Sequence, residues 1–306
     1  MTATADHPAV RFQDVTKRFG EFTAVNDISF EVPRGTIFGI LGSNGAGKTT
    51  SIRMLMNIFK PDGGRVEVLG AQVDESLKPK IGYLPEERGL YKKMRIGEML
   101  RFFGRIKGRD DAFLDDAIDR WLTWGGLDAW RTRKVEELSK GMSQKLQFIS
   151  TVIHAPDLLI LDEPFSGLDP VNRDVLRDAV LEMHRDGTTI VFSTHVMEQA
   201  EQLCQELVLV HRGQIRVRGT LKEVRAAEGR QAAHIRYKLE PGKTLNGLPG
   251  VAEVADHGNE AELTLEPGAD GQVLLRALLE RGEVMRFELR EPSLHEIFKR
   301  VAGGVA

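Results

Sequence analysis

The stretch GILGSNGAGKTTSIRML, residues 39–55, decides the fold of this chain. It fits the pattern G-x-x-x-x-G-K-[ST], in which Gly42, Gly47, Lys48 and Thr49 occupy the fixed positions. The apolar run TIFGIL overlaps its start, and an apolar face at helical spacing follows it: Ile52, Leu55, Met56 and Phe59. A strand, a glycine-rich loop and a helix in this order predict a P-loop, which binds phosphate.

The residues of this loop suit a polyphosphate. Glycines let the backbone turn tightly and keep Cβ atoms away from phosphate oxygens, and the following helix adds free amides. We expect Lys48 to reach the β- and γ-phosphates, Thr49 to ligate Mg²⁺ and Thr50 to lie near the α-phosphate. The alternative is an ordinary glycine-rich turn with an exposed lysine, but the flanking strand and helix favour nucleotide binding. The predicted cradle is Ser43, Asn44, Gly45, Ala46, Gly47, Lys48, Thr49 and Thr50.

The composition gives no sign of a nucleic-acid-binding, disulfide-bonded or membrane-spanning protein. The chain has 306 residues, enough for one large domain or for a medium and a small one. Lys and Arg number 42 against 45 Asp and Glu, so the net charge of −3 gives no case for nucleic acid. The single cysteine, Cys204, excludes an internal disulfide and favours a reducing compartment. No signal peptide and no run of about 18 apolar residues occurs, so we expect a chain that is soluble in the cytoplasm.

Patterns along the chain indicate two domains. Residues 8–228 alternate strands with helices, which favours a mainly parallel sheet with covered faces, and residues 10–32 predict two strands around a turn. Residues from about 90 to 154 predict a helical subdomain. The polar segment VRAAEGRQ, residues 224–231, is interpreted as a linker. Residues 229–306 combine alternating strands with two amphipathic segments and predict a small accessory α+β domain.

A second segment with candidate site residues is LLILDE, residues 158–163, an apolar strand that ends in two acids. An aspartate at a strand end beside a P-loop is where Mg²⁺ can be held, which makes Asp162 a candidate metal ligand. The adjacent Glu163 would then orient or deprotonate an attacking water. A strand ending in Asp is common by itself, and the preceding P-loop is what makes this pattern informative.

Three further residues are unremarkable when taken singly. Ser139 is a natural N-cap for the helix that follows it, Asp169 lies in a turn before a helix, and His195 ends an apolar strand. A capped helix, a turn and a packed surface histidine would explain all three. Their order along the chain after the P-loop is what favours a functional interpretation.

Taken in order, these segments resemble the ATP-binding subunits of ABC transporters. The match runs from Phe19 to His195 and follows the family order of Walker A, signature, Walker B, D-loop and switch histidine. The segment LSKGM, residues 138–142, is similar to the family's LSGGQ, with Lys140 in place of glycine and Met142 in place of glutamine. The resemblance implies that Ser139 and Gly141 grip the γ-phosphate of ATP held by a second protomer, a role that the helix dipole supports.

The resemblance also implies roles for single residues. Asp169 matches the D-loop, which lines the dimer seam, and His195 matches the histidine that contacts the γ-phosphate. Phe19 stands where the family has an aromatic ring that stacks on adenine, and Val25 would flank it.

One position departs from the family pattern. Where the family has glutamine after the strand GYLP, this chain has Glu86. A carboxylate there could bind the metal more tightly but would repel phosphate, and the alternative is that Glu86 points away and replaces glutamine only sterically. The candidate metal ligands are Thr49, Asp162 and Glu86.

A segment near the C-terminus resembles one group of proteins within this family. The segment EPSLHEIFKRVAG, residues 291–303, resembles the C-terminal extension of ATPase subunits in drug and sodium exporters of the daunorubicin-resistance type. It therefore suggests export. Leu294, Ile297, Phe298 and Val301 form an apolar face that packing within the tail, or across a dimer, would explain as well.

The sequence thus predicts an α/β fold of the P-loop ABC ATPase type, with a mainly parallel sheet, an antiparallel β subdomain, a helical subdomain and the small α+β domain. The resemblance implies hydrolysis of ATP with Mg²⁺ by Lys48, Glu163 and His195. It also implies a homodimer that powers a separate integral membrane permease from the cytoplasmic face. The alternative is a soluble ABC-type ATPase that acts on ribosomes or DNA. Such proteins usually carry two cassettes or a long coiled-coil insertion, which this sequence lacks. A non-hydrolysing scaffold is expected to lack Glu163 or Lys48.

Overall fold

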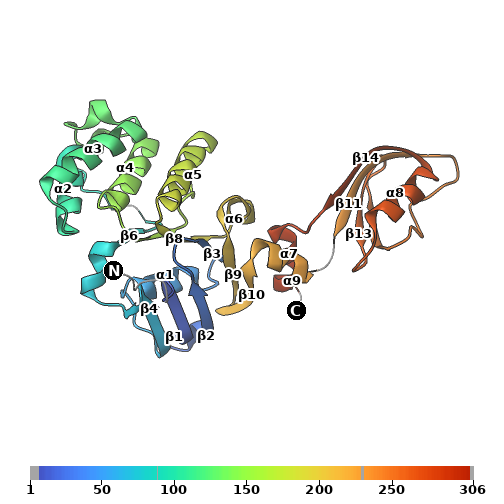
Figure 1. Ribbon diagram of the computed structural model, residues 1–306, viewed down its shortest axis with the longest axis horizontal. Coiled ribbons are helices and arrows are strands. Elements are labelled where there is room, and N and C mark those ends of the chain that lie inside the picture. The colour runs from blue at the N-terminus through green and yellow to red at the C-terminus, as the bar shows by residue number, and fades with distance from the viewer. Residues whose placement is uncertain (1–6, 88, 229–230, 304–306) are drawn as a thin grey trace. The chain divides into compact units, whose positions relative to one another are not determined.

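The computed structural model describes residues 7–87, 89–228 and 231–303 (Figure 1). The chain divides into two compact units, Met1–Arg218 and Gly219–Ala306. The division falls ahead of helix α7 (Leu221–Glu228), whereas the sequence analysis placed the domain boundary after residue 228. Each unit has its own hydrophobic core and is described by itself.

An antiparallel sheet begins the first unit. Its strand order is β2-β1-β4-β5, and its strands are β1 (Val10–Phe19), β2 (Phe22–Val32), β4 (Gly63–Val68) and β5 (Ala71–Gln72). Apolar side chains of β1 and β2 are buried together, and the rings of Phe12 and Phe30 stack with their centroids 4.5 Å apart. This sheet is the antiparallel subdomain that the sequence predicts.

A six-stranded sheet forms the centre of the first unit, in the order β10-β9-β3-β8-β7-β6. The five strands from β9 to β6 run parallel. Every residue of β3, β7 and β8 is buried, as expected for a sheet that is covered on both faces. The predicted mainly parallel core is therefore confirmed. The strands are β3 (Ile37–Leu41), β6 (Ile81–Leu84), β7 (Leu158–Asp162), β8 (Thr189–Thr194), β9 (Glu206–His211) and β10 (Gln214–Thr220).

Helices cover this sheet and connect its strands (Figure 1). Helix α1 (Lys48–Leu55) contacts β2, β4 and β7, so it lies between the two sheets. Helices α5 (Pro170–Arg185) and α6 (Met197–Leu203) pack against β8, and a 3₁₀ turn, η1 (Glu75–Lys80), precedes β6.

Strand register brings three loops to one edge of the sheet. Leu41 at the end of β3 pairs with Thr194 at the end of β8, and Asp162 at the end of β7 pairs with Ser193. The loops that follow β3, β7 and β8 therefore begin side by side, because parallel strands have their carboxyl ends at the same edge.

A group of helices forms the helical subdomain. Helices α2 (Ile96–Ile106), α3 (Asp111–Gly125) and α4 (Lys140–Val152) contact one another, and two 3₁₀ turns, η2 (Asp128–Trp130) and η3 (Val135–Glu137), lie between α3 and α4. The apolar faces of these helices meet in the middle, although Ile106 and Phe113 are exposed. The fully buried members are Ile96, Met99, Leu100, Leu114, Ile118 and Leu122.

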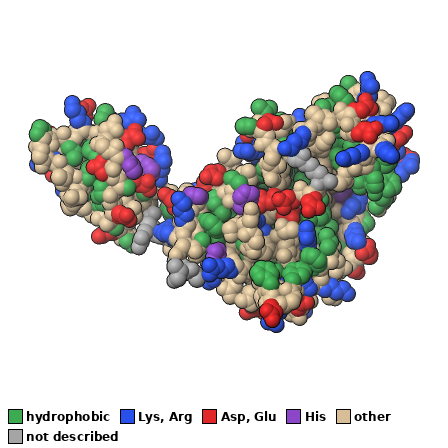
Figure 2. All heavy atoms as spheres, turned by 180° about the vertical axis from the view of Figure 1, so that it is seen from behind, with side chains coloured by type: hydrophobic (Ala, Val, Ile, Leu, Met, Phe, Trp, Pro, Cys, Tyr) green, Lys and Arg blue, Asp and Glu red, His purple; other side chains and the backbone are tan. Residues whose placement is uncertain are grey.

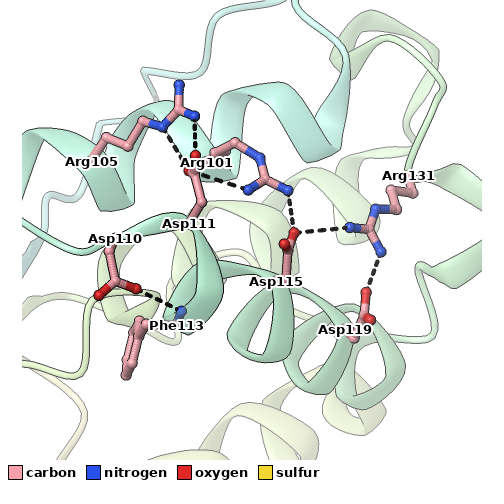
Figure 3. Close-up of polar contacts among 8 residues, drawn as sticks. All are labelled: Arg101, Arg105, Asp110, Asp111, Phe113, Asp115, Asp119 and Arg131. Carbon is pink, nitrogen blue, oxygen red and sulfur yellow. Dashed lines mark hydrogen bonds and ion pairs between the residues drawn. The ribbon is translucent and has the colours of Figure 1, made fainter.

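Ion pairs join the outer faces of these helices (Figure 3). Arg101 of α2 contacts both Asp111 and Asp115 of α3, and Arg105 of α2 donates to Asp111 at 2.8 Å. Arg131 pairs with Asp119 one turn further along α3. Because the acids recur every four residues on one face of α3, the arginines of α2 and of the segment before η3 hold that face along its length.

The second unit is a four-stranded antiparallel sheet with helices. Its strand order is β12-β13-β11-β14, and Ala233, Ile235 and Tyr237 of β11 are buried against Leu274 and Leu278 of α8 in its core. The predicted α+β pattern is present. The strands and helix are β11 (Ala232–Leu239), β12 (Val251–Asp256), β13 (Glu260–Leu265), β14 (Gly282–Arg290) and α8 (Gly271–Leu279).

The segment interpreted as a linker is helical up to residue 228, so that interpretation was wrong for residues 224–228; residues 229–230 lie outside the described residues. Helix α7 packs against α9 (Leu294–Gly303), and Val224 is buried. Both helices begin with a reciprocal capping box. The Glu223 amide donates to the Thr220 hydroxyl, and the Thr220 amide donates to the Glu223 carboxylate. Ser293 and Glu296 form the same pair of hydrogen bonds.

The surface carries both signs of charge. On the face drawn in Figure 2, Lys and Arg side chains are interspersed with Asp and Glu side chains. Such a mixture agrees with the small net charge of −3.

A buried histidine connects the helical subdomain to the central sheet. His154 follows α4, and its Nε2 lies 3.2 Å from the carbonyl oxygen of Ile81 at the start of β6. Because that oxygen can only accept, Nε2 carries the proton, and Nδ1 is left buried without a hydrogen-bond partner in the described residues. Burial, with the nearby charge of Lys107, lowers the pKa of His154 to about 4.

We therefore predict a stability loss in mild acid that originates at His154. The folded pKa lies below the ordinary value of 6.5, so this stabilisation is complete above pH 6.5 and is lost as the pH falls towards 4. The free energy of unfolding should fall by about 2 kcal/mol between pH 8 and pH 5 through this group. His154→Gln, which keeps a donor for Ile81, should flatten that dependence.

Urea unfolding followed by tryptophan fluorescence measures this effect in the first unit alone, because Trp121, Trp124 and Trp130 all lie there. The exposed His7 of the same unit supplies the matched control, His7→Gln. An unchanged pH slope in His154→Gln would contradict the prediction.

Candidate active site

The P-loop has a shape that only glycine permits at two positions. A Cβ on Gly42 would lie 2.3 Å from the carbonyl oxygen of Val210, and one on Gly47 would lie 2.5 Å from that of Ala24. Gly47 also has a φ of 109°, where L residues are strained. The turn between β9 and β10 holds the loop from the other side, since the Gly213 amide donates to the Ala46 oxygen at 2.9 Å.

Lys48 lies inside this loop. Its Nζ donates to the carbonyl oxygens of Gly42 at 2.9 Å and of Ser43 at 3.1 Å, and it lies 3.4 Å from Glu163 Oε1. The side chain is buried, so its charge is poorly hydrated and is held by the loop's own oxygens. The structure therefore places the ammonium group where the P-loop surrounds it.

Asp162 ends β7 and receives two hydroxyl groups. Its Oδ1 accepts from Ser193 Oγ at 2.6 Å and from Thr49 Oγ1 at 3.3 Å. Burial raises the pKa of Asp162, and the two hydroxyl hydrogen bonds oppose that rise. A carboxylate oxygen beside a threonine hydroxyl is a pair of hard oxygen donors, the ligand type that Mg²⁺ prefers. These two residues fit the cation, and in the described residues no group of three or more His, Cys, Asp or Glu side chains gathers to hold a metal alone.

Glu163 connects the lysine with the histidine. Its Oε1, the atom near Lys48, also lies 2.9 Å from His195 Nδ1. Its backbone has a φ of 49°, an uncommon conformation for this residue, and its amide donates to Ser193 Oγ at 3.1 Å. The carboxylate is thus buried at the end of β7 with a cation on one side and an imidazole on the other. The three residues that the sequence predicts as catalytic are neighbours.

Two predicted adenine contacts differ in exposure. The Phe19 side chain is 44% exposed and meets the ring of Phe59 edge-on, with centroids 5.3 Å apart. Its open surface is available to a base. Val25 is 1% exposed and belongs to the core beside the P-loop, so it supports the loop from beneath.

The signature and D-loop residues lie at helix starts. Ser139 Oγ accepts from the Met142 amide at 3.3 Å at the N-terminus of α4, and Ser139 is exposed. Asp169 Oδ1 accepts from the Asn172 amide at 3.0 Å at the start of α5, and this hydrogen bond lowers the pKa of Asp169. The hydrogen bonds described for Lys48, Thr49 and Glu163 within the described residues involve neither segment.

Glu86 is exposed just beyond β6 and borders two hollows. The first, which we call the inner cavity, also has Glu163, Gln144, Ser166 and Asn172 in its wall. The second is a groove between the sheet and the helical subdomain, bordered by Asp162, Arg53 and Lys107 among others. Glu86 therefore borders one hollow with Glu163 and the other with Asp162, while its role as a metal ligand remains a prediction.

Comparison with known proteins identifies the family. Residues 25–166 match the family described as ABC transporter, and residues 219–302 match the C-terminal domain of DrrA1-3-like ATP-binding proteins. The uncharacterised ABC transporter ATP-binding protein YhaQ of Bacillus subtilis (strain 168) is 40% identical over 95% of this chain and 97% of its own length. The chain belongs to the ATP-binding proteins of ABC transporters.

Two further comparisons agree. The Nod factor export ATP-binding protein I of Paraburkholderia xenovorans (strain LB400) is 31% identical over 96% of this chain and 97% of that protein. A solved structure of the ATP-binding subunit of an ABC transporter superposes with a TM-score of 0.68 and 29% identity, covering 72% of this chain and 93% of its own. As a member of this family, the chain binds ATP and hydrolyses it. None of the helices in the described ranges is long and apolar enough to cross a membrane.

Sequence reasoning missed one residue of this ABC ATPase site. Ser193 is fully buried, donates to Asp162 and accepts from the Glu163 amide. The signal was indirect: Ser193 lies two residues before His195, on the strand whose end meets that of β7.

We predict that Ser193→Ala impairs both stability and turnover. The substitution leaves the Glu163 amide buried without its acceptor and frees the Asp162 carboxylate to move, so the first unit should lose about 1–3 kcal/mol of unfolding free energy. ATP turnover should fall about tenfold because Asp162 and Glu163 lose their fixed positions. Urea unfolding and a phosphate-release assay measure the two effects.

Thr189 supplies a control at the opposite end of the same strand. Its hydroxyl accepts from the Gly35 amide at 2.9 Å, so Thr189→Ala should lower stability similarly but leave turnover within about twofold. Equal loss of turnover in the two variants would show that Ser193 acts only through stability.

Proposed function

We propose that this chain is one of two identical ATP-binding subunits that close around two ATP molecules and power export through separate membrane subunits. One observation carries the proposal. The P-loop, the ends of β7 and β8, and His195 form one connected group, whereas Ser139 presents an exposed helix N-terminus outside it. Free amides at a helix start suit a phosphate, and a second copy would bring one to each P-loop.

The chemistry proposed for each site is phosphoryl transfer to water. Lys48 neutralises charge on the β- and γ-phosphates, and Glu163 orients and deprotonates the attacking water. His195 contacts the γ-phosphate. Thr49 and Asp162 would hold Mg²⁺, which supplies further charge neutralisation when bound. The contact between Lys48 and Glu163 keeps the base beside the phosphate-binding loop.

Two comparisons support the direction of transport. The name of the relative from Paraburkholderia xenovorans describes export, and that protein aligns with nearly the whole chain. The second unit matches the C-terminal domain of DrrA1-3-like proteins, in agreement with the resemblance of residues 291–303 to exporter ATPases. We therefore propose an exporter, with the substrate selected by the membrane subunit.

The permease contact proposed here is the groove beside Glu86 and the adjoining surface of the helical subdomain. Tyr91 and Phe102 are both large, apolar and exposed there. Their rings meet edge-on, with the ring centroids 5.8 Å apart. Exposed aromatic pairs of this kind are typical of protein interfaces. A partner seated there would hold the chain on the cytoplasmic face of the membrane.

Glu163→Gln tests the catalytic assignment. The amide keeps the size of the side chain but cannot take a proton, so hydrolysis should fall at least about 100-fold while ATP binding persists. The variant should then elute as a dimer with ATP and as a monomer with ADP in size-exclusion chromatography. Glu182→Gln, at a half-buried glutamate of α5 that pairs with Arg120, is the control and should behave as the parent. A Glu163→Gln protein that turns over ATP at the parental rate would refute the role of Glu163.

Charge placed on the aromatic pair tests the membrane contact. Tyr91→Arg and Phe102→Arg should reduce the fraction of the chain recovered with washed membranes from cells that express the complete system. Purified protein should keep its ATPase rate, because both residues lie away from the P-loop group. Leu279→Arg, at an exposed apolar position on α8, is the matched control. Membrane recovery that is unchanged in both aromatic variants would place the partner elsewhere.

A further inference from the structure

Gln147 occupies an unusual position in α4. The side chain is 7% exposed, and its neighbours along the helix, Leu146 and Phe148, are fully buried. Three separate hollows share it as a wall: the inner cavity beside Glu163, the groove beside Asp162, and a third hollow bordered by Leu138 and Lys140 of the signature. One carboxamide thus lies where the catalytic edge, the groove and the signature region meet.

The carboxamide is joined to the loop that follows β6. Gln147 Nε2 donates to the carbonyl oxygen of Glu87 at 3.4 Å, a long hydrogen bond from helix to loop. A buried amide is costly unless it is hydrogen-bonded, so this polar residue is not explained by packing alone. The helix is fixed at the same point, because Ser150 Oγ and Thr151 Oγ1 both donate to the Gln147 carbonyl oxygen, at 2.7 and 2.9 Å.

The hydrogen bond of Gln147 lies on the same helix as Ser139. Ser139 caps the helix, and Gln147 lies two turns further along it. The loop at the other end of the link follows β6, whose neighbour β7 ends at Asp162, the residue before Glu163. A hydrogen-bonded helix transmits a displacement along its axis, so a shift of the Glu86–Glu87 loop reaches Ser139 through Gln147.

We propose that Gln147 is a positioning residue that couples the Glu86–Glu87 loop to the N-terminus of α4. Ser139 is then held in place for the partner's ATP only while the loop is seated against the helix. This inference rests on the proposed function, because it assumes that two subunits close around ATP. The Gln147 side chain would thus link the ATP site of its own subunit to Ser139, which contacts the ATP bound by the partner subunit.

Two substitutions separate coupling from packing. Gln147→Met keeps the length and fills the same space but has no amide, and Gln147→Glu keeps the shape but places a carboxylate against a carbonyl oxygen. Gln144 is the matched control, one turn earlier on the same helix, because its Nε2 donates at 3.4 Å to Ser166 in the loop after β7. Gln144→Met removes the same chemical group without touching the Glu87 link.

The measurement is ATP-dependent dimerisation in the Glu163→Gln background, followed by analytical ultracentrifugation over a range of protein concentrations. Gln147→Met should raise the dimer dissociation constant about fivefold, the effect of one lost hydrogen bond, and Gln147→Glu should raise it more. The affinity of the separated monomer for ATP should change less than about twofold, because the P-loop is intact. Hydrogen exchange should rise in residues 81–87 and 138–142 together in both Gln147 variants, and not together in Gln144→Met.

Dimerisation and exchange that are unchanged in Gln147→Met would overturn the coupling role and leave Gln147 as a packing residue. Faster exchange in residues 81–87 without any change in residues 138–142 would overturn it as well. These results are distinct from failure of the proposed function, which would appear in the background protein itself. If Glu163→Gln alone forms no dimer with ATP, the paired-subunit proposal fails before Gln147 is tested.

Discussion

The pairing of β3, β8 and β7 in a buried parallel sheet is the constraint on which the site depends. The three strands end at the same edge of the sheet, so the P-loop, the two acids and the histidine begin side by side there. Every residue of these strands is buried, and a slip of one residue would exchange the two faces of a strand. The hydrophobic core therefore sets the catalytic register, and the polar groups occupy the positions that it provides.

Each buried charge at this edge of the sheet has polar or oppositely charged partners close by. Lys48 is surrounded by carbonyl oxygens and by Glu163, so its buried charge has partners before any nucleotide arrives. Asp162 lies next in sequence to another acid, and two hydroxyls stabilise its buried carboxylate. Glu163 adopts an uncommon backbone conformation, which turns its side chain towards Lys48 and His195. Such local strain persists only where surrounding contacts over-determine it, and Ser193 supplies one of them.

The features that could be predicted from the sequence are those encoded within one segment. The P-loop, the strand ending at Asp162 and the N-cap at Ser139 each have a local pattern, and each is present. Ser193 and Gln147 were missed because their importance comes from contacts with residues about 30 and 60 positions away. Helix α7 was mistaken for a linker because polar composition outweighed the capping box at Thr220, a local signal that was available. The exposed position of Glu86 beside two hollows had no local signal at all.

The construction of the helical subdomain bears on how such a site could be regulated. Its three helices share an apolar core, and arginines of α2 and of the segment before η3 hold the acids of α3, so the group resists internal change (Figure 3). Ser139 stands on one helix of this group, outside the cluster around Lys48. Motion of the subdomain relative to the sheet therefore changes the position of Ser139 without disturbing the P-loop. The groups around Lys48 and the N-terminus of α4 therefore lie on different segments of the chain.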